Sequence, residues 1–160
     1  MALEFSTVGA KVKYCWETTS GTRPTSGYTE LPNVNTAPEL NLSPELIDAS
    51  DISDYINRYI AGRQDPGGDM EFTLNHTEAV ITAWNALVSS VDTKRASGYQ
   101  LWWEYVYPGA TNSYYWAGYP LQLGTSGIEQ NALSTIPAHV VLTDWDGWQT
   151  ASTTPSPPST

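Results

Sequence analysis

Residues 65–69 read Asp-Pro-Gly-Gly-Asp, and two carboxylates around a Gly-rich turn could in principle bind a metal ion or cradle a phosphate. An EF-hand calcium loop needs acids at its first, third and fifth positions, then a Gly and a distant Glu, whereas Pro66 and Gly68 fill the middle here. A phosphate loop leads into a helix and usually carries a Lys, whereas a strand-like acidic segment follows here. The five residues therefore predict a turn that starts a strand.

Other residues that often take part in catalysis or metal binding are isolated in this sequence. Asp144 and Asp146 could form the carboxylate pair of a glycoside hydrolase, but their surroundings are equally typical of a strand end and a turn. His76 and His139 are far apart, and Cys15 lies within an alternating strand pattern. No Gly-x-Ser-x-Gly nucleophile motif occurs. We therefore expect no catalytic residues, no metal site and no cofactor.

The charge balance limits the possible partners. The chain has 160 residues, with 7 Lys and Arg against 17 Asp and Glu, and a formal net charge of −10. Proteins that grip nucleic acid use cations to replace the counterions of the phosphates, so direct binding of DNA or RNA is not expected, whereas an acidic surface would repel it. The single cysteine excludes an internal disulfide. Since the start of the chain lacks signal-peptide features and no long apolar run occurs, we expect a cytoplasmically folded protein without a membrane span.

Alternation of apolar and polar residues predicts a mostly β protein. Residues 18–38 are rich in Thr, Ser, Gly and Pro and predict a long loop, and 108–112 predict a hairpin loop. Residues 37–47 predict a short strand between prolines, and 124–136 predict a loop or a further strand. The main predicted strands are 11–17, 69–75, 99–107, 113–123 and 138–145.

One helix is predicted, at about 77–92. Asn75 is expected to be its N-cap, with Glu78 completing a capping box, while Lys94 and Arg95 follow its end, where cations stabilise the helix dipole. The order of elements predicts an antiparallel β-sandwich or partial barrel flanked by a helix. The helix carries one apolar stripe, formed by Val80, Ile81, Trp84, Leu87, Val88 and Val91.

The segment from about 46 to 68 is predicted to be a long loop. It mixes acids with large apolar residues, and this apolar content argues against simple disorder. Long irregular segments inside compact domains are usually functional when they are not disordered. We expect residues 1–150 to form one domain and residues 151–160, which are rich in Pro, Ser and Thr, to form a tail or linker.

The aromatic residues leave two functions open. The chain has seven Trp and ten Tyr, and many of them fall within the predicted 99–123 hairpin. An exposed row of rings would suit a carbohydrate-binding module, which is the alternative function. Burial in a core and in contacts between subunits accounts better for so many rings. The rings concerned are Trp102, Trp103, Tyr105, Tyr107, Tyr114, Tyr115, Trp116 and Tyr119.

Residues 54–87, DYINRYIAGRQDPGGDMEFTLNHTEAVITAWNAL, together with YQLWWEYVYPG after the helix, resemble the major tail tube proteins of phages with long non-contractile tails. In that family a loop ends at a Gly-Asp strand start, and a strand, a helix and a hairpin follow. The same order covers most of residues 8–148 here. The resemblance implies a tail tube fold, shared with contractile-tail and type VI secretion tube proteins. It also implies six-membered rings that stack into a tube, whose inner strands form a continuous barrel for DNA ejection into the host.

The resemblance also implies partners and site residues. The partners would be further copies of the chain, the tail terminator and tail tip proteins, and a tape measure protein in the lumen, with DNA passing without specific binding. The chain would belong to the tail of the virion, assembled in the cytoplasm of the bacterial host. The residues expected to bridge neighbouring rings or subunits are Asp48, Asp51, Ile52, Asp54, Tyr55, Ile56, Arg58, Tyr59, Arg63 and Asp65. The candidate lumen acids, which would repel DNA, are Glu45, Asp48, Asp69 and Glu71.

Overall fold

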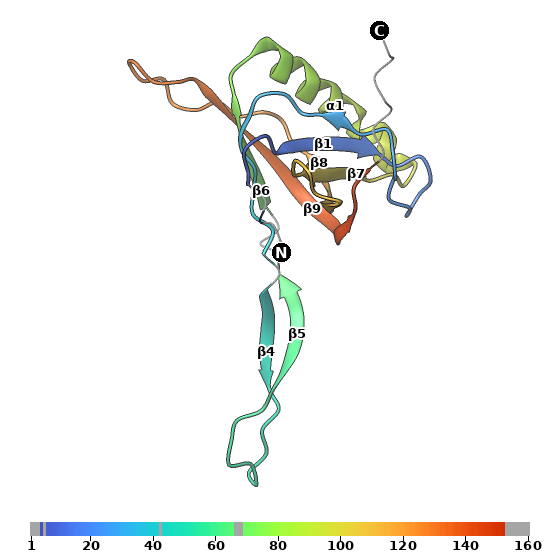
Figure 1. Cartoon of the computed structure of the whole chain (residues 1–160), viewed down its shortest axis with the longest axis vertical. Helices are drawn as coiled ribbons and strands as arrows, with labels where there is room; N and C mark the ends of the chain where they lie inside the picture. Colours follow the sequence, from blue (N-terminus) through green and yellow to red (C-terminus); the bar gives the residue numbers. More distant parts are fainter. Residues whose placement is uncertain (1–3, 5, 42, 66–68, 153–160) are drawn as a thin grey trace.

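The computed structural model describes residues 4, 6–41, 43–65 and 69–152, and it contains a curled β body, one helix and a separate hairpin (Figure 1). Residues 66–68 of the predicted turn at 65–69 and most of the predicted tail, 153–160, lie outside the described residues. The elements are β1 (Lys11–Trp16), β2 (Thr29–Glu30), β3 (Val34–Thr36), β4 (Ser43–Asp48), β5 (Tyr59–Asp65), β6 (Asp69–Asn75), α1 (Glu78–Ala96), β7 (Leu101–Val106), β8 (Asn112–Pro120) and β9 (Thr135–Thr150).

Seven strands form one antiparallel sheet in the order β2-β1-β7-β8-β9-β6-β3. β2 and β3 lie at opposite edges of this sheet, yet only residues 31–33 separate them in the chain. A link of that length spans at most about 14 Å, so the sheet must curl until its two edges approach each other. Leu31 secures the link, because its N–H donates to the Val12 carbonyl at 2.8 Å and its side chain is buried. The predicted partial barrel is therefore confirmed.

Aromatic side chains fill the concave side of the sheet. β6 directs Met70, Phe72 and Leu74 inward, as its alternation predicts. Trp103 of β7 and Trp116 of β8 stack there with their ring centroids 5.7 Å apart, and Phe72 lies 5.1 Å from Trp103. These rings are fully buried, so burial is the main role of the predicted aromatic hairpin.

Helix α1 covers this aromatic core. Val80, Trp84 and Leu87 are buried against it, and the Trp84 indole N–H donates to the Leu121 carbonyl at 2.7 Å. The helix extends to Ala96, which is four residues beyond its predicted end. No helix among the described residues is both long and apolar enough to cross a membrane.

The start of the helix differs from the prediction. Thr77, and not Asn75, is the N-cap, and its hydroxyl accepts the Val80 N–H at 3.3 Å. Asn75 is the last residue of β6 and pairs with Thr135 of β9. Its backbone is therefore committed to the sheet, and the prediction for this residue was wrong.

The first part of the segment predicted as the long loop 18–38 packs against a second, smaller cluster on the convex side of the sheet, whereas Leu31, Val34 and Ala37 pack in the main core. Tyr28 covers this second cluster, which contains Trp102 and Tyr115. The Arg23 guanidinium lies 4.0 Å from the centre of the Tyr115 ring and pairs with Asp146 of β9. This segment also contributes β2 and β3, which the sequence did not predict, because strands of two and three residues show no alternation.

Strand β9 is twice as long as predicted and pairs with two strands in succession. Its first part pairs with β6 and its second part with β8. The register shifts where β8 passes Gly118. A Cβ at this position would meet the Val141 carbonyl at 2.7 Å and a Val140 methyl at 2.6 Å. Only Gly allows the two strands to approach so closely here. Residues 124–134 form a loop without a strand.

A buried carboxylate fastens the end of β9. Glu104 is fully buried on the convex side of the sheet. It accepts hydrogen bonds from the Ser152 N–H at 2.9 Å, the Ser152 hydroxyl at 2.7 Å and the Tyr115 hydroxyl at 2.7 Å. Burial disfavours the charged carboxylate, but these hydrogen bonds outweigh burial, so the pKa of Glu104 lies below its ordinary value of 4.5.

We predict that Trp84→Ala lowers the free energy of unfolding by about 3–5 kcal/mol, because it removes a fully buried ring and leaves a cavity. Urea denaturation followed by circular dichroism measures this loss. Trp145→Ala is the matched control, because Trp145 is 41% exposed, and it should cost much less. A loss below about 1 kcal/mol for Trp84→Ala would mean that the helix does not pack on the sheet.

We also predict that Glu104→Gln destabilises the protein by about 1–2 kcal/mol at pH 7, because the amide replaces a charged acceptor of three hydrogen bonds. Since the folded pKa is lowered, the wild-type advantage is complete above the unfolded pKa and disappears as the pH falls through the folded pKa. Denaturation curves of both proteins between pH 7 and pH 3 should therefore converge in the acid range. A difference that stays constant over that range would contradict a charged Glu104.

Candidate functional site: a projecting arm and an open strand edge

The structure corrects the predicted loop at 46–68, because β4 and β5 form an antiparallel hairpin there. We call residues 43–65 the arm. The arm is a two-stranded sheet of its own, with Ile47 opposite Ile60 and Asp48 opposite Tyr59, and it projects away from the body (Figure 1). The loop was predicted because acids interrupt the apolar alternation, whereas the observed register contains a bulge near Pro44 that absorbs the irregularity.

The tip of the arm, residues 49–58, is held by its own polar side chains. The Asp51 carboxylate accepts the Ser53 N–H and the Ser53 hydroxyl, both at 2.6 Å. Asp54 accepts the Asp51 N–H at 2.8 Å and the Arg58 guanidinium N–H at 3.1 Å. The Ser50 hydroxyl accepts the Arg58 N–H at 2.7 Å. These bonds give the tip a defined shape without a hydrophobic core.

The acids of the tip therefore have a structural role. Hydrogen bonds from the backbone N–H and the hydroxyl of Ser50 lower the pKa of Asp48. Bonds from the hydroxyl and N–H of Ser53 lower the pKa of Asp51 in the same way. Both carboxylates are thus charged at neutral pH and engaged within the arm.

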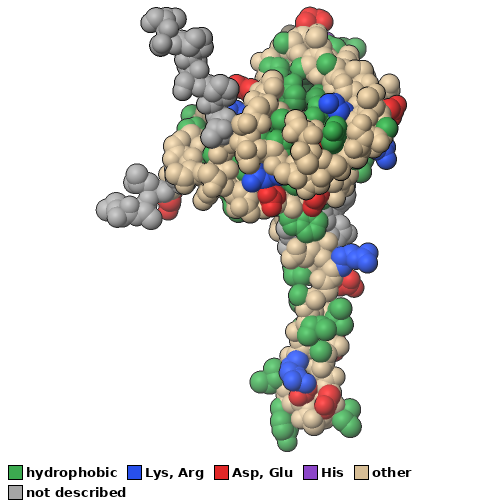
Figure 2. Space-filling view, turned by 90° about the vertical axis from the view of Figure 1, so that its right-hand side faces the viewer, with side chains coloured by type: hydrophobic (Ala, Val, Ile, Leu, Met, Phe, Trp, Pro, Cys, Tyr) green, Lys and Arg blue, Asp and Glu red, His purple; other side chains and the backbone are tan. Residues whose placement is uncertain are grey.

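With its polar groups turned to each other, the arm presents its large apolar side chains to solvent. Ile52 and Tyr55 at the tip are completely exposed, and Ile56 is 79% exposed. Figure 2 shows hydrophobic side chains around the end of the arm. Contiguous exposed apolar groups of this kind mark interaction surfaces. The exposed apolar residues of the arm are Leu46, Ile47, Ile52, Tyr55, Ile56, Tyr59 and Ile60.

All ten predicted bridging residues lie on the arm. Arg63 and Asp65 belong to β5, and the side chain of Asp65 lies outside the description. Sequence reasoning missed Leu46 and Ile47, although their apolar character beside the predicted residues could have identified them.

The four candidate lumen acids do not form one cluster. Glu45 and Asp48 belong to the arm, whereas Glu71 is exposed on β6 and lies opposite His139 of β9. Asp69 begins β6, and nothing is described of its side chain. Glu45 and Asp48 thus lie on the arm, whereas Glu71 lies on the face of the sheet that points away from the aromatic core.

A second candidate interaction surface is the edge of β9. Residues 142–150 pair with β8 on one side, and within the described part of the chain they have no strand on the other side, because β6 ends its pairing at Val141. Trp145 and Trp148 on this segment are 41% and 58% exposed. Unpaired N–H and C=O groups on a strand edge are a template for pairing with another chain. The pairing of this segment with β8 is interrupted twice, by an extra residue at Thr143 and another at Asp146.

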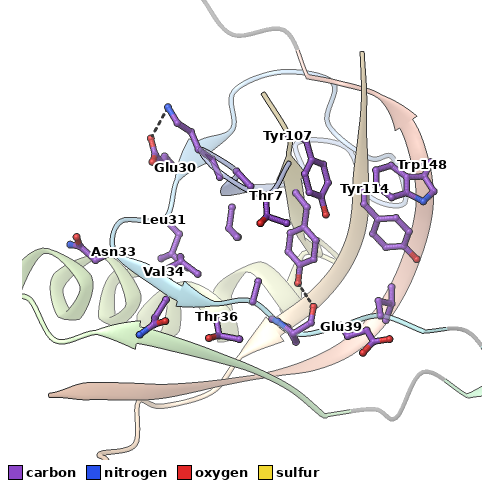
Figure 3. Close-up of a pocket in the computed structure, with 18 residues that line it drawn as sticks. Thr7, Glu30, Leu31, Asn33, Val34, Thr36, Glu39, Tyr107, Tyr114 and Trp148 are labelled. Carbon is purple, nitrogen blue, oxygen red and sulfur yellow. Dashed lines mark hydrogen bonds and ion pairs between the residues drawn. The ribbon is translucent and has the colours of Figure 1, made fainter. Parts of the chain in front are cut away.

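One hollow is a cavity of about 760 Å³ at the open end of the partial barrel (Figure 3). Tyr107, Tyr114 and Trp148 point toward one another on one of its walls. The Trp148 ring lies 5.3 Å from Tyr114 and 5.9 Å from Tyr107, between ring centroids. Trp148 could not be assigned to this wall from the sequence, because its place beside the hairpin depends on the extra length of β9.

The residues considered for catalysis are dispersed and already paired. Asp146 pairs with Arg23, His76 lies 2.9 Å from the Ser134 hydroxyl through Nδ1, and the Cys15 thiol donates weakly to the Ser26 carbonyl. Burial raises the pKa of Cys15 and disfavours its thiolate. Among the described residues, no group of three His, Cys, Asp or Glu side chains could hold a metal ion.

Comparison with known proteins supports the fold. No protein-family model matches the sequence, and a search of curated proteins finds no match. Solved structures with a similar fold include a chain of the six-fold symmetrised cryo-EM structure of the anti-feeding prophage baseplate. That match has a TM-score of 0.55 and 8% sequence identity, and it covers 95% of this chain and 96% of the other. The similarity shows that the chain shares the fold of this baseplate component along nearly its whole length.

Proposed function

We propose that this protein is a structural subunit of a phage-type tail, in which copies of the chain form six-membered rings that stack into a tube. The observation on which the proposal rests most is the arm, whose tip is shaped by hydrogen bonds and whose apolar side chains have no partner surface on the body. In the assembled particle each arm docks on a neighbouring copy in the same ring or the next one.

The arm has the properties of a preorganised binding element. Its polar groups are satisfied within the tip, so docking does not require their rearrangement. Ile52, Tyr55 and Ile56 are exposed in the isolated chain and would gain by burial at about 25 cal/mol per Å² of apolar surface. A preorganised element loses little conformational entropy on binding.

The edge of β9 supports the same assembly. Repeated head-to-tail contacts around a rotation axis close into a ring, and pairing of the 142–150 edge with a strand of the next copy would remove an exposed edge from every subunit. The fold shared with a component of a six-fold symmetrised baseplate agrees with such an arrangement.

The charge of the chain suits a conduit for DNA. With 17 acids against 7 cations, the assembled tube is strongly anionic, and an acidic lumen repels phosphates and prevents DNA from adhering. Glu71 is the most suitable lumen acid, because it is exposed on the body and is not engaged in the fold of the arm. The further partners are the tail terminator and tip proteins and a tape measure protein within the lumen.

We predict that the double variant Ile52→Ser, Tyr55→Ser folds normally and forms no rings or tubes. Both side chains are fully exposed in the single chain, so the unfolding free energy should change by less than about 0.5 kcal/mol per site. Negative-stain electron microscopy and size-exclusion chromatography measure the assembly.

Ile128→Ser is the matched control for the arm variant. Ile128 is equally exposed but lies in the loop before β9, and its replacement should leave assembly intact. Tubes formed by the arm variant, or a wild-type chain that stays monomeric at every concentration, would refute the proposed assembly through the arm.

We further predict that Glu71→Lys permits assembly but slows the release of DNA from particles, and most strongly at low salt. A cation in the lumen attracts phosphates by releasing their counterions, and salt screens this attraction. Glu71→Gln removes the negative charge without adding a positive one, so its effect should be smaller. Release at the wild-type rate from Glu71→Lys particles in low salt would exclude Glu71 from the lumen.

A further inference from the structure

We propose that a cationic aromatic surface at the end of helix α1 receives the tip of the arm of a second copy of the chain. We call this surface the patch, and it consists of Trp16, Lys94, Arg95, Tyr99 and Tyr119. The inference rests on the proposed function, in which arms join the copies, and it names the surface on which an arm docks.

The patch combines two neighbouring cations with three aromatic rings. The Lys94 ammonium lies 5.8 Å from the centre of the Tyr99 ring, and the Arg95 guanidinium lies 5.0 Å from that of Tyr119. The Trp16 ring is 6.5 Å from Tyr119, between centroids. Arg95 is exposed and the other four side chains are half-buried. Trp, Tyr and Arg are the residue types that contribute most to binding energy in protein interfaces.

Backbone hydrogen bonds fix the shape of the patch. Gly98, with a φ of 77°, turns the chain at the end of α1. The Gly98 N–H donates to the Arg95 carbonyl and the Tyr99 N–H to the Lys94 carbonyl, both at 2.9 Å. The Tyr119 hydroxyl donates to the Tyr99 carbonyl at 3.0 Å. Since these terminal carbonyls already have donors, the patch is preorganised and loses little conformational entropy on binding.

The arm is complementary to the patch in charge and in apolar character. Residues 43–65 contain five acids and two arginines, a net charge of −3, whereas the patch carries two cations. The Asp51 carboxylate accepts two hydrogen bonds from Ser53, and a carboxylate has about four acceptor positions. The others are free for N–H groups of the patch, in charge-assisted hydrogen bonds. The exposed Ile52 and Tyr55 would then pack on its rings.

The position of the arm makes the occupant a second copy. The arm leaves the body on the side opposite α1 (Figure 1), so its tip cannot contact the patch of its own chain. An arm at one end of the molecule and a patch near the other give a head-to-tail contact, in which each copy uses its arm once and its patch once. Such contacts do not close between two copies but continue into a larger assembly.

The test combines two variants that each lack one half of the contact. The patch variant is Lys94→Glu, Arg95→Glu, and the arm variant is Ile52→Ser, Tyr55→Ser. The patch variant should require a concentration about tenfold higher or more for assembly in size-exclusion chromatography, since its acids repel those of the arm. When the two are mixed, an affinity-tagged patch variant should retain the arm variant on a resin, because its arm and the other variant's patch are both intact. Neither variant should retain its own kind.

Lys94→Arg is the matched control, because it keeps both charges and should assemble like the wild type. Lys94→Gln, Arg95→Gln adds no acid beside the helix end and gives the same comparison if circular dichroism shows that the charge reversal unfolds the chain. Normal assembly of a folded patch variant, together with failure of the arm variant, would overturn the docking surface and leave the proposed function standing. A mixture in which neither variant retains the other would also overturn it. A wild-type chain that never assembles would instead refute the proposed function itself.

Discussion

The packing of Trp103 is the interaction on which the rest of the fold depends. Its ring lies within 6 Å, between centroids, of rings from four other elements: Tyr14 of β1, Phe72 of β6, Trp84 of α1 and Trp116 of β8. The indole N–H is satisfied by the Gly118 carbonyl at 3.3 Å. One buried side chain therefore contacts the helix and both halves of the curled sheet, and the other large core residues pack around it.

Because the core of the body is complete without the arm, the arm is not needed for the stability of the body. The body buries its aromatic rings without any contribution from residues 43–65, and the short link between β2 and β3 brings the edges of the sheet together. The apolar residues of the arm consequently have no role in the stability of the body. Large exposed side chains that do not stabilise the chain that carries them lower its solubility. Their presence is best explained by a surface outside this chain that covers them.

The body could be predicted from the sequence more fully than the candidate site. Alternation identified β1, β6, β7, β8 and the helix stripe, since one face of each element is buried in the main aromatic core. The helix cap was misassigned because Asn75 and Thr77 are both good caps, and only the pairing of β6 with β9 decides between them. The arm was taken for a loop because both of its faces meet solvent. Neither face therefore imposes a hydrophobic period, and the hairpin depends instead on cross-strand pairing and on the hydrogen bonds of its tip.

The structure of the tip also shows that part of the negative charge of the chain is engaged in local hydrogen bonds. Asp48, Asp51 and Asp54 appear in the sequence as an acidic run beside apolar residues, which suggests an electrostatic surface. In the structure each carboxylate accepts N–H or hydroxyl groups of its own turn, and Arg58 offsets part of the charge. A carboxylate bonded to backbone N–H groups fixes the shape of a turn, and its field at a distance is reduced by the neighbouring cation and by salt. Charge that acts on a polyanion in a channel must therefore come from acids that accept no hydrogen bonds within their own turn. Glu71 on the body is such an acid, whereas Asp48, Asp51 and Asp54 shape the tip that presents the apolar residues of the arm.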